Sequence, residues 1–156
     1  MVRLAIQRGY EDVSILAVTE AANVGYSTFF RHFDVLDELM TSVVVPAFDE
    51  LKRRVSEIVS IYDEALALFR FVGEYQDLYR IYLSLPKSRP RRQAVDGAAL
   101  ELLAARCEGH QHTAEPFELS IEIVEAITGR LIHLYRDNIN TYTPEQMASM
   151  HFDLVV

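Results

Sequence analysis

Side chains that could bind a metal ion gather near residues 107–115. They are of types that zinc accepts: Cys107, His110, His112 and Glu115. Their spacing matches no standard set of zinc ligands, and the stretch 109–114 has the composition of a polar loop between helices. We therefore predict no metal site there.

The usual sequence motifs of catalysis are not found either. The chain carries no Gly-rich phosphate-binding loop, no nucleophile elbow and no HExxH sequence. A basic stretch, PKSRPRR at residues 86–92, could contact DNA or an acidic ligand, but a solvated loop is the favoured interpretation. We predict that the protein is not an enzyme and needs no cofactor.

The stretch NVGYSTFFRHF, residues 23–33, combines hydroxyl, guanidinium and imidazole groups with three Phe. Asn23 tolerates the left-handed conformation that ends a helix, and Gly25 is an acceptable N-cap for the next one. Ser14 is the expected N-cap of a helix over residues 15–22, and a second helix should cover residues 26–32. Two short helices joined this tightly predict a helix-turn-helix.

Composition sets limits on the protein class. The 156 residues suffice for one domain, or for a small domain fused to a helical body, and half of them are apolar. No apolar run is long enough for a membrane span, and a single cysteine is typical of a reducing cytoplasm. The net charge of −8 argues against a generally basic nucleic-acid coat but leaves room for a local DNA-binding patch.

Helical periodicity runs through nearly the whole chain, so the predicted fold class is all-α. The helix over 15–22 should bury Ile15, Val18 and Ala22. A first helix should end at Arg8, with left-handed Gly9 after it. Further helices are expected over 35–60, where Pro46 kinks or interrupts the helix, over 62–85, where Gly73 breaks it, and over 93–108. Two more should follow, one from 115 or 116 to about 138 and a last one capped by Thr143, Pro144 and Gln146.

Residues 9–39, GYEDVSILAVTEAANVGYSTFFRHFDVLDEL, resemble the DNA-binding region of TetR-family transcriptional regulators. The matching features are the Gly9-Tyr10 pair, the Ser14 cap, NVGYSTFFRHF, and LDEL at the start of the next helix. The closing DNINTYTPEQMASMHFDLVV is similar to the end of many members. The resemblance implies a helix-turn-helix DNA-binding domain over 1–42, with a shortened first helix, and a ligand-binding and dimerisation domain over 43–156.

The resemblance also implies a mechanism. Such a protein is a homodimer, and each subunit places one recognition helix in the major groove of a palindromic operator in double-stranded DNA. It is typically a repressor, released from DNA when a small molecule binds among the middle helices. The aromatic content of this chain suggests a small and largely apolar or aromatic ligand.

Several residues acquire expected DNA-contacting roles from the resemblance. Tyr26 and Ser27 would face base edges, while Thr28, Arg31 and His32 would contact phosphates. Phe29 and Phe33 match core positions that anchor the helix. The expected DNA-contacting residues are therefore Tyr26, Ser27, Thr28, Phe30, Arg31 and His32.

Two departures weaken the expected DNA contacts. Phe30 stands where the family usually has a Tyr, and Leu36 where it usually has a Lys. The first 45 residues also carry a formal charge of −3, since they contain three Arg and six Asp or Glu. Phosphate contacts dominate nonspecific DNA affinity, so we expect weak binding and a shallow salt dependence. The alternative is a TetR-like ligand-binding dimer that no longer binds DNA.

The resemblance places two further sites in the helical body. Aromatic residues at 75, 79 and 82 share one helix face and could line a ligand pocket or simply form core. The candidate pocket residues are Phe69, Tyr75, Tyr79, Tyr82 and Cys107. The last two helices would form the dimer interface, with the candidate residues Ile123, Ile127, Leu131, Leu134, Met147, Met150 and Leu154.

Overall fold

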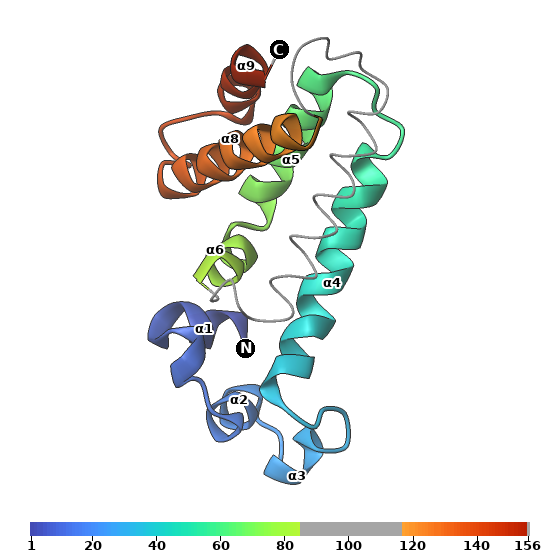
Figure 1. The fold of residues 1–156 in the computed structure, drawn as a ribbon. Helices are drawn as coiled ribbons and strands as arrows, with labels where there is room; N and C mark the ends of the chain where they lie inside the picture. Colours follow the sequence, from blue (N-terminus) through green and yellow to red (C-terminus); the bar gives the residue numbers. More distant parts are fainter. Residues whose placement is uncertain (85–116, 156) are drawn as a thin grey trace.

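The computed structural model describes residues 1–84 and 117–155, and within these ranges it contains helices and no strand (Figure 1). The prediction of an all-α fold is confirmed. Predicted features over residues 85–116, including the basic loop, the helix over 93–108 and Cys107, lie outside the described residues. The elements are α1 (Val2–Arg8), the 3-10 helix η1 (Tyr10–Asp12), α2 (Ile15–Ala22), α3 (Tyr26–Phe29), α4 (Leu36–Val55), α5 (Ile61–Glu74), α6 (Gln76–Ser84), α8 (Phe117–Asp137) and α9 (Pro144–Val155).

The molecule has a head at one end, residues 1–35 with α1, η1, α2 and α3, and a body formed by α5, α6, α8 and α9 (Figure 1). Helix α4 begins at the head and runs along the body, with α5 returning beside it. Helix α6 also reaches the head, where it packs on α1. The head is therefore joined to the body through two helices.

Gly9 ends α1, as expected, but not in the predicted left-handed helical conformation. Its φ of 86° is paired with a ψ of 147°, a region that essentially only glycine occupies. The chain turns there into η1, and the Tyr10 hydroxyl donates a hydrogen bond to the Asp37 carboxylate at the start of α4. This contact ties the first turn of α4 to the head.

Helix α4 is continuous through Pro46, so of the two predicted effects, a kink or an interruption, the interruption is wrong. A proline inside a helix removes one backbone hydrogen bond and costs about 3 kcal/mol. Here Pro46 is exposed, while Val44 and Ala47 on either side are buried in the core. The helix ends at Val55 rather than near Ser60, because the Ser60 hydroxyl instead caps the start of α5, accepting from the Asp63 N–H at 3.3 Å.

The carboxyl end of α4 is fastened to α5 by Arg54. Its guanidinium pairs with Glu50 on α4 and with Glu74 on α5, and it lies 5.6 Å from the centroid of the Phe71 ring. Hydrogen bonds from Arg53 and Arg54 lower the pKa of the Glu50 carboxyl to about 2. The end of α4 is thus held in place by both charge and ring contacts.

The break between α5 and α6 lies at Tyr75, two residues beyond the predicted position at Gly73. Gly73 is instead a point of close approach between α5 and α8. A Cβ atom built at Gly73 would lie 3.0 Å from the Tyr135 hydroxyl oxygen. The glycine is therefore explained by packing and not by helix termination.

One hydrophobic cluster connects the head to the body. Ala5 on α1 and Val18 on α2 belong to the same cluster of buried residues as Met40 on α4 and Phe69 on α5. The predicted boundary between residues 42 and 43 falls inside α4 and inside this cluster. Helices α1 and α2 of the head are consequently part of a shared core.

Helix α9 packs mainly on α5 and also contacts α8. The predicted capping box starts it, since the Gln146 N–H donates to Thr143 Oγ1 at 3.2 Å and the Thr143 N–H donates to Gln146 Oε1 at 2.9 Å. His151 on α9 is buried among these helices. Its Nε2 lies 2.9 Å from Thr128 Oγ1 on α8, and its ring packs on Phe69 of α5.

Candidate nucleic-acid interface

Helix α2 is the supporting helix of the helix-turn-helix, and local signals define both of its ends. The Ser14 hydroxyl accepts a hydrogen bond from the Ala17 N–H at 3.1 Å, which confirms the predicted N-cap. Val18 is buried as expected, but Ile15 is only half-buried and Ala22 is exposed. Thr19 is buried instead, because its hydroxyl donates to backbone carbonyls of α2.

The turn between α2 and α3 has the predicted geometry. Asn23 adopts φ 54° and ψ 45°, the left-handed conformation that ends a helix. The N–H groups of Asn23 and Val24 both return to carbonyls of the last turn of α2, each at 3.0 Å, as in a Schellman motif. Gly25 is extended, and its carbonyl accepts the Thr28 N–H at 2.8 Å, so α3 begins at Tyr26.

Helix α3 is shorter than predicted. It covers Tyr26–Phe29, and the three residues that follow form a turn rather than the expected helix to His32. Backbone hydrogen bonds from His32 and Phe33 to the Phe29 carbonyl, each 3.0 Å, keep this turn compact. The recognition element is thus one helical turn plus a hydrogen-bonded turn.

Phe29 anchors the recognition element to the head. It is only 5% exposed, and its ring lies 5.7 Å from the half-buried Phe33 and 5.4 Å from Phe30. The structure is consistent with the expected anchoring roles of Phe29 and Phe33. The side of α3 that carries Phe29 packs against the head, and its opposite side faces solvent.

The predicted DNA-contacting side chains are brought together on that solvent side. Tyr26, Ser27, Phe30, Arg31 and His32 are exposed, and Thr28 is half-buried. Within the described residues no other group hydrogen-bonds the side chains of Ser27 or Thr28. These hydroxyls are available to a phosphate or a base edge. The structure brings all six predicted residues to one tip of the molecule.

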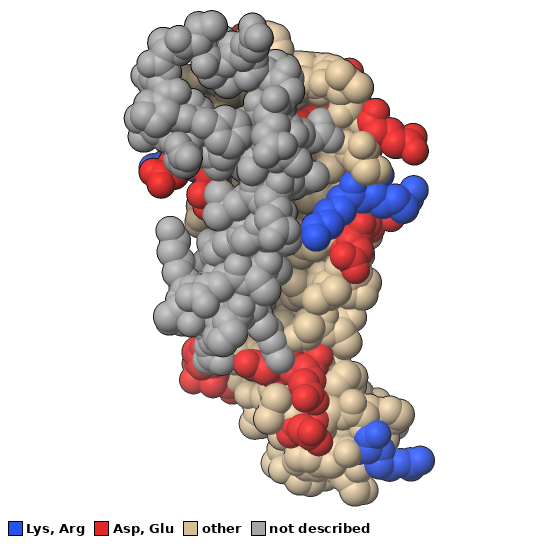
Figure 2. All heavy atoms as spheres, turned by 45° about the vertical axis from the view of Figure 1, so that its right-hand side comes forward, with Lys and Arg blue, Asp and Glu red and all other residues tan. Residues whose placement is uncertain are grey.

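The charge around this tip is unfavourable for DNA. Figure 2 shows, on the face in view, carboxylates gathered above the tip of the head and basic atoms at one side of it. Arg31 is the cation in the recognition element, and the first 45 residues carry the formal charge of −3 noted above. Long-range attraction to DNA is therefore weak, and contacts at short range must supply more of the affinity.

Of the predicted ligand-pocket residues, Phe69 and Tyr79 are packed tightly against other side chains. Phe69 is fully buried, and Tyr79 is 4% exposed, with burial raising the pKa of its hydroxyl. Their rings pack on other aromatic side chains, Phe69 on Tyr135 and Tyr79 on Phe48. Tyr75 is half-buried on Phe71. The side chains of Tyr82 and Cys107 lie outside the described residues. Phe69 and Tyr79 are therefore core residues.

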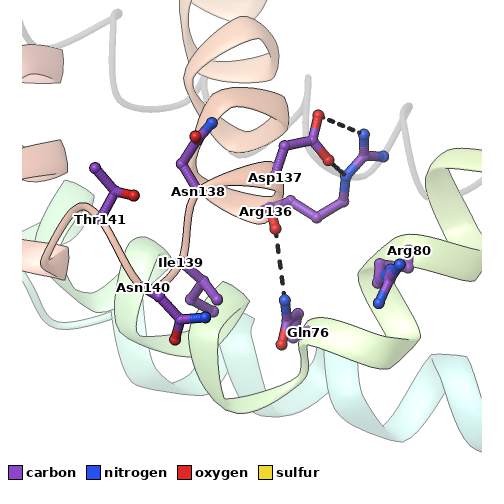
Figure 3. Close-up of a pocket in the computed structure, with 8 residues that line it drawn as sticks. All are labelled: Gln76, Arg80, Arg136, Asp137, Asn138, Ile139, Asn140 and Thr141. Carbon is purple, nitrogen blue, oxygen red and sulfur yellow. Dashed lines mark hydrogen bonds and ion pairs between the residues drawn. The ribbon is translucent and has the colours of Figure 1, made fainter.

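A hollow of about 380 Å³ lies elsewhere, beside α6 (Figure 3). Figure 3 shows Gln76 on α6 pointing toward the end of α8, with Arg80 on the same helix. The Gln76 side-chain amide donates to the Arg136 carbonyl at 3.5 Å, and the Arg136 guanidinium binds Asp137, whose pKa it lowers. The lining is polar: Gln76, Arg80, Arg136, Asp137, Asn138, Ile139, Asn140 and Thr141.

Sequence reasoning missed this hollow. Its walls come from two segments about sixty positions apart, and no local spacing rule brings them together. The only available signal was the polar run after residue 135, which is also what an ordinary helix end looks like.

The predicted dimer residues divide into three groups by burial. Leu131 and Met147 are buried inside the subunit and belong to its core cluster, so the expectation that they contact a partner is not supported. Ile127 is half-buried against the same cluster. The remaining four are exposed: Ile123, Leu134, Met150 and Leu154.

Comparison with known families agrees with the architecture of the head. Residues 2–43 match the model of bacterial regulatory proteins of the tetR family. Neither the curated proteins nor the solved structures gave a match to the chain. The described residues contain no helix long and apolar enough to cross a membrane.

The matched segment begins with α1 and ends within α4, so it contains α2, the left-handed turn at Asn23 and α3. The head of the chain therefore matches the DNA-binding domain of the tetR family of bacterial regulatory proteins, and its α2–α3 unit is the helix-turn-helix of a DNA-binding transcription regulator.

Proposed function

We propose that this regulator is a homodimeric repressor that binds a palindromic operator and is released by a small molecule. The observation that carries the proposal is the tip formed by α3 and the turn after it, where Ser27 and Arg31 are exposed and Thr28 is half-buried. Hydroxyl and guanidinium groups at the start of a recognition helix are suited to phosphates and base edges in a major groove.

Dimerisation is supported by exposed apolar side chains on the last two helices. Ile123 and Leu134 are eleven residues apart on α8, which puts them on the same helix face, and Met150 and Leu154 are one turn apart on α9. Apolar side chains on neighbouring helices are typical of a surface that a partner covers. A second copy of the chain would place two recognition elements on two half-sites.

Release by a ligand is supported by the position of the hollow. Helix α6 supplies one wall of it and also packs on α1 in the head. A ligand that binds the hollow more tightly in one position of α6 favours the position of the head that goes with it. The shift in that equilibrium equals the difference between the ligand's affinities for the two positions. The volume and polar lining suit a small polar molecule, in place of the apolar ligand expected from the sequence.

DNA binding is tested by fluorescence anisotropy with duplexes selected by the protein from a random pool. We expect saturable binding that is lost when Thr28→Ala is combined with Tyr26→Ala. If only Arg31 of each subunit contacts a phosphate, the salt slope is about −1.8, and affinity falls about twelvefold between roughly 50 and 200 mM salt. Failure to select any duplex at low salt would favour the alternative, a dimer that does not bind DNA.

Dimerisation is tested by sedimentation velocity with Leu134→Glu. A carboxylate at this exposed position should make the protein monomeric without unfolding it. Val59→Glu is the matched control, because Val59 is an apolar residue that is 89% exposed and lies between α4 and α5. A Leu134→Glu protein that remained dimeric would contradict the proposed interface.

A further inference from the structure

The exposed surface of the recognition element is partly aromatic. Tyr26 is 52% exposed and Phe30 is 46% exposed, and their ring centroids lie 5.3 Å apart in an edge-to-face arrangement. The two residues are four positions apart, so they share one face of the turn. Together they form a continuous apolar strip, which we name the Tyr26–Phe30 strip.

The strip is held in place from below. The Phe30 ring also packs edge-on against Phe29, at 5.4 Å, and Phe29 is buried. Phe30 therefore rests on an anchored ring and does not fold back into the protein core. Within the closed turn, an apolar side chain fixed in this exposed position loses little further conformational freedom when it binds.

The chemistry of Phe30 limits what it can recognise. Its side chain has no hydrogen-bond donor or acceptor, so it cannot read the polar pattern of a base edge. The apolar feature of the major groove is the C5-methyl group of thymine, which phenylalanine contacts favourably. The carboxylates around the head weaken attraction to phosphates, so short-range apolar contacts take a larger share of the recognition.

We propose that the Tyr26–Phe30 strip reads thymine methyl groups in the major groove, with Phe30 as the residue that determines this specificity. The proposal rests on the proposed operator binding, since it assigns a base preference to the same tip. Each operator half-site then carries thymine at the positions that face the strip. Arg31 and Thr28 contribute phosphate contacts that do not depend on sequence.

The test removes the methyl group alone. A duplex selected from the random pool is remade with deoxyuridine in place of thymidine, first throughout and then one position at a time. Base pairing is kept, and only the C5-methyl groups are lost. We expect affinity to fall about fourfold for each contacted methyl, since burying one such group is worth that factor. The loss should map to a few thymines in each half-site.

Two variants assign the effect to the protein. Phe30→Ala should bind the thymine and uracil duplexes with equal affinity, while Phe30→Tyr, which keeps the ring, should retain the preference for thymine. Arg31→Ala is the matched control from the adjacent position. It should bind both duplexes more weakly, with a shallower salt slope, and keep the same ratio between them.

The outcomes separate the two proposals. Saturable binding to the thymine duplex with equal affinity for the uracil duplex would overturn the methyl-reading proposal and leave operator binding intact. A preference for thymine that Phe30→Ala retains would overturn the role of Phe30, because the methyl groups would then be read by Tyr26 or act through DNA shape. A protein that selects no duplex would overturn both.

Discussion

Gly73 offers a sharp test of how α5 and α8 pack. Replacing Gly73 by Ala has two opposing effects. Alanine is favoured over glycine inside a helix by about 0.8–1 kcal/mol. The added methyl group, however, would lie 3.0 Å from the Tyr135 hydroxyl oxygen, closer than an ordinary contact. Tyr135 is 3% exposed and its ring packs on Phe69, so it has little room to move away.

Overpacking of this kind costs about 1–3 kcal/mol. The net effect of Gly73→Ala should therefore be a loss of about 1 kcal/mol in the free energy of unfolding. The sign should reverse in a Tyr135→Phe background, because the nearest ring atoms then lie 3.7 Å away, an ordinary contact distance. There Gly73→Ala should stabilise by about 1 kcal/mol, its helix propensity alone.

The assay is urea denaturation followed by circular dichroism, on all four proteins of the cycle at one protein concentration. A fixed concentration matters because dimerisation would couple to folding. The expected coupling between the two sites is about 2 kcal/mol. Equal effects of Gly73→Ala in both backgrounds would show that the Tyr135 hydroxyl does not limit this contact, and the packing argument would fail.

Two further predictions concern the last helix. Burial lowers the pKa of His151 below its ordinary value, so the unfolded chain takes up the proton first as pH falls. The free energy of unfolding should therefore decrease as the pH is lowered past about 6.5, by at most about 1.4 kcal/mol per pH unit. His151→Gln should flatten this dependence in denaturation curves measured across pH. Thr143→Ala removes the N-cap of α9 and should cost about 1 kcal/mol in the same assay, with an unchanged midpoint contradicting the role of the capping box.

Local capping signals in the sequence predicted three helix ends correctly: both ends of α2 and the start of α9. Ser14, Asn23 and the Thr143–Gln146 pair each act on backbone groups within three or four residues, so their effect can be read from the chain itself. The same signals located the helix-turn-helix and brought the DNA-contacting residues to one tip. Whether those side chains contact DNA stays a prediction.

Features that depend on distant partners were not predictable in the same way. Gly73 looks like a helix breaker in sequence, and only the neighbouring Tyr135 on α8 reveals its packing role. A face of aromatic residues is equally compatible with core and with a pocket wall, so Phe69 and Tyr79 could not be assigned from periodicity. Leu131 and Leu134 lie on the same helix, yet one faces the core and the other solvent.

The short length of α3 affects the free energy that is needed to order the recognition element when it binds DNA. Phe29 is its one buried residue, and it lies outside the cluster that unites the head with the body. A single helical turn has little stability of its own. The turn can therefore open locally without melting the shared core, and the backbone amides of His32 and Phe33 should exchange hydrogen with water faster than those of α2. DNA selects the closed turn, so part of the binding free energy is used to order the helix that makes the contact.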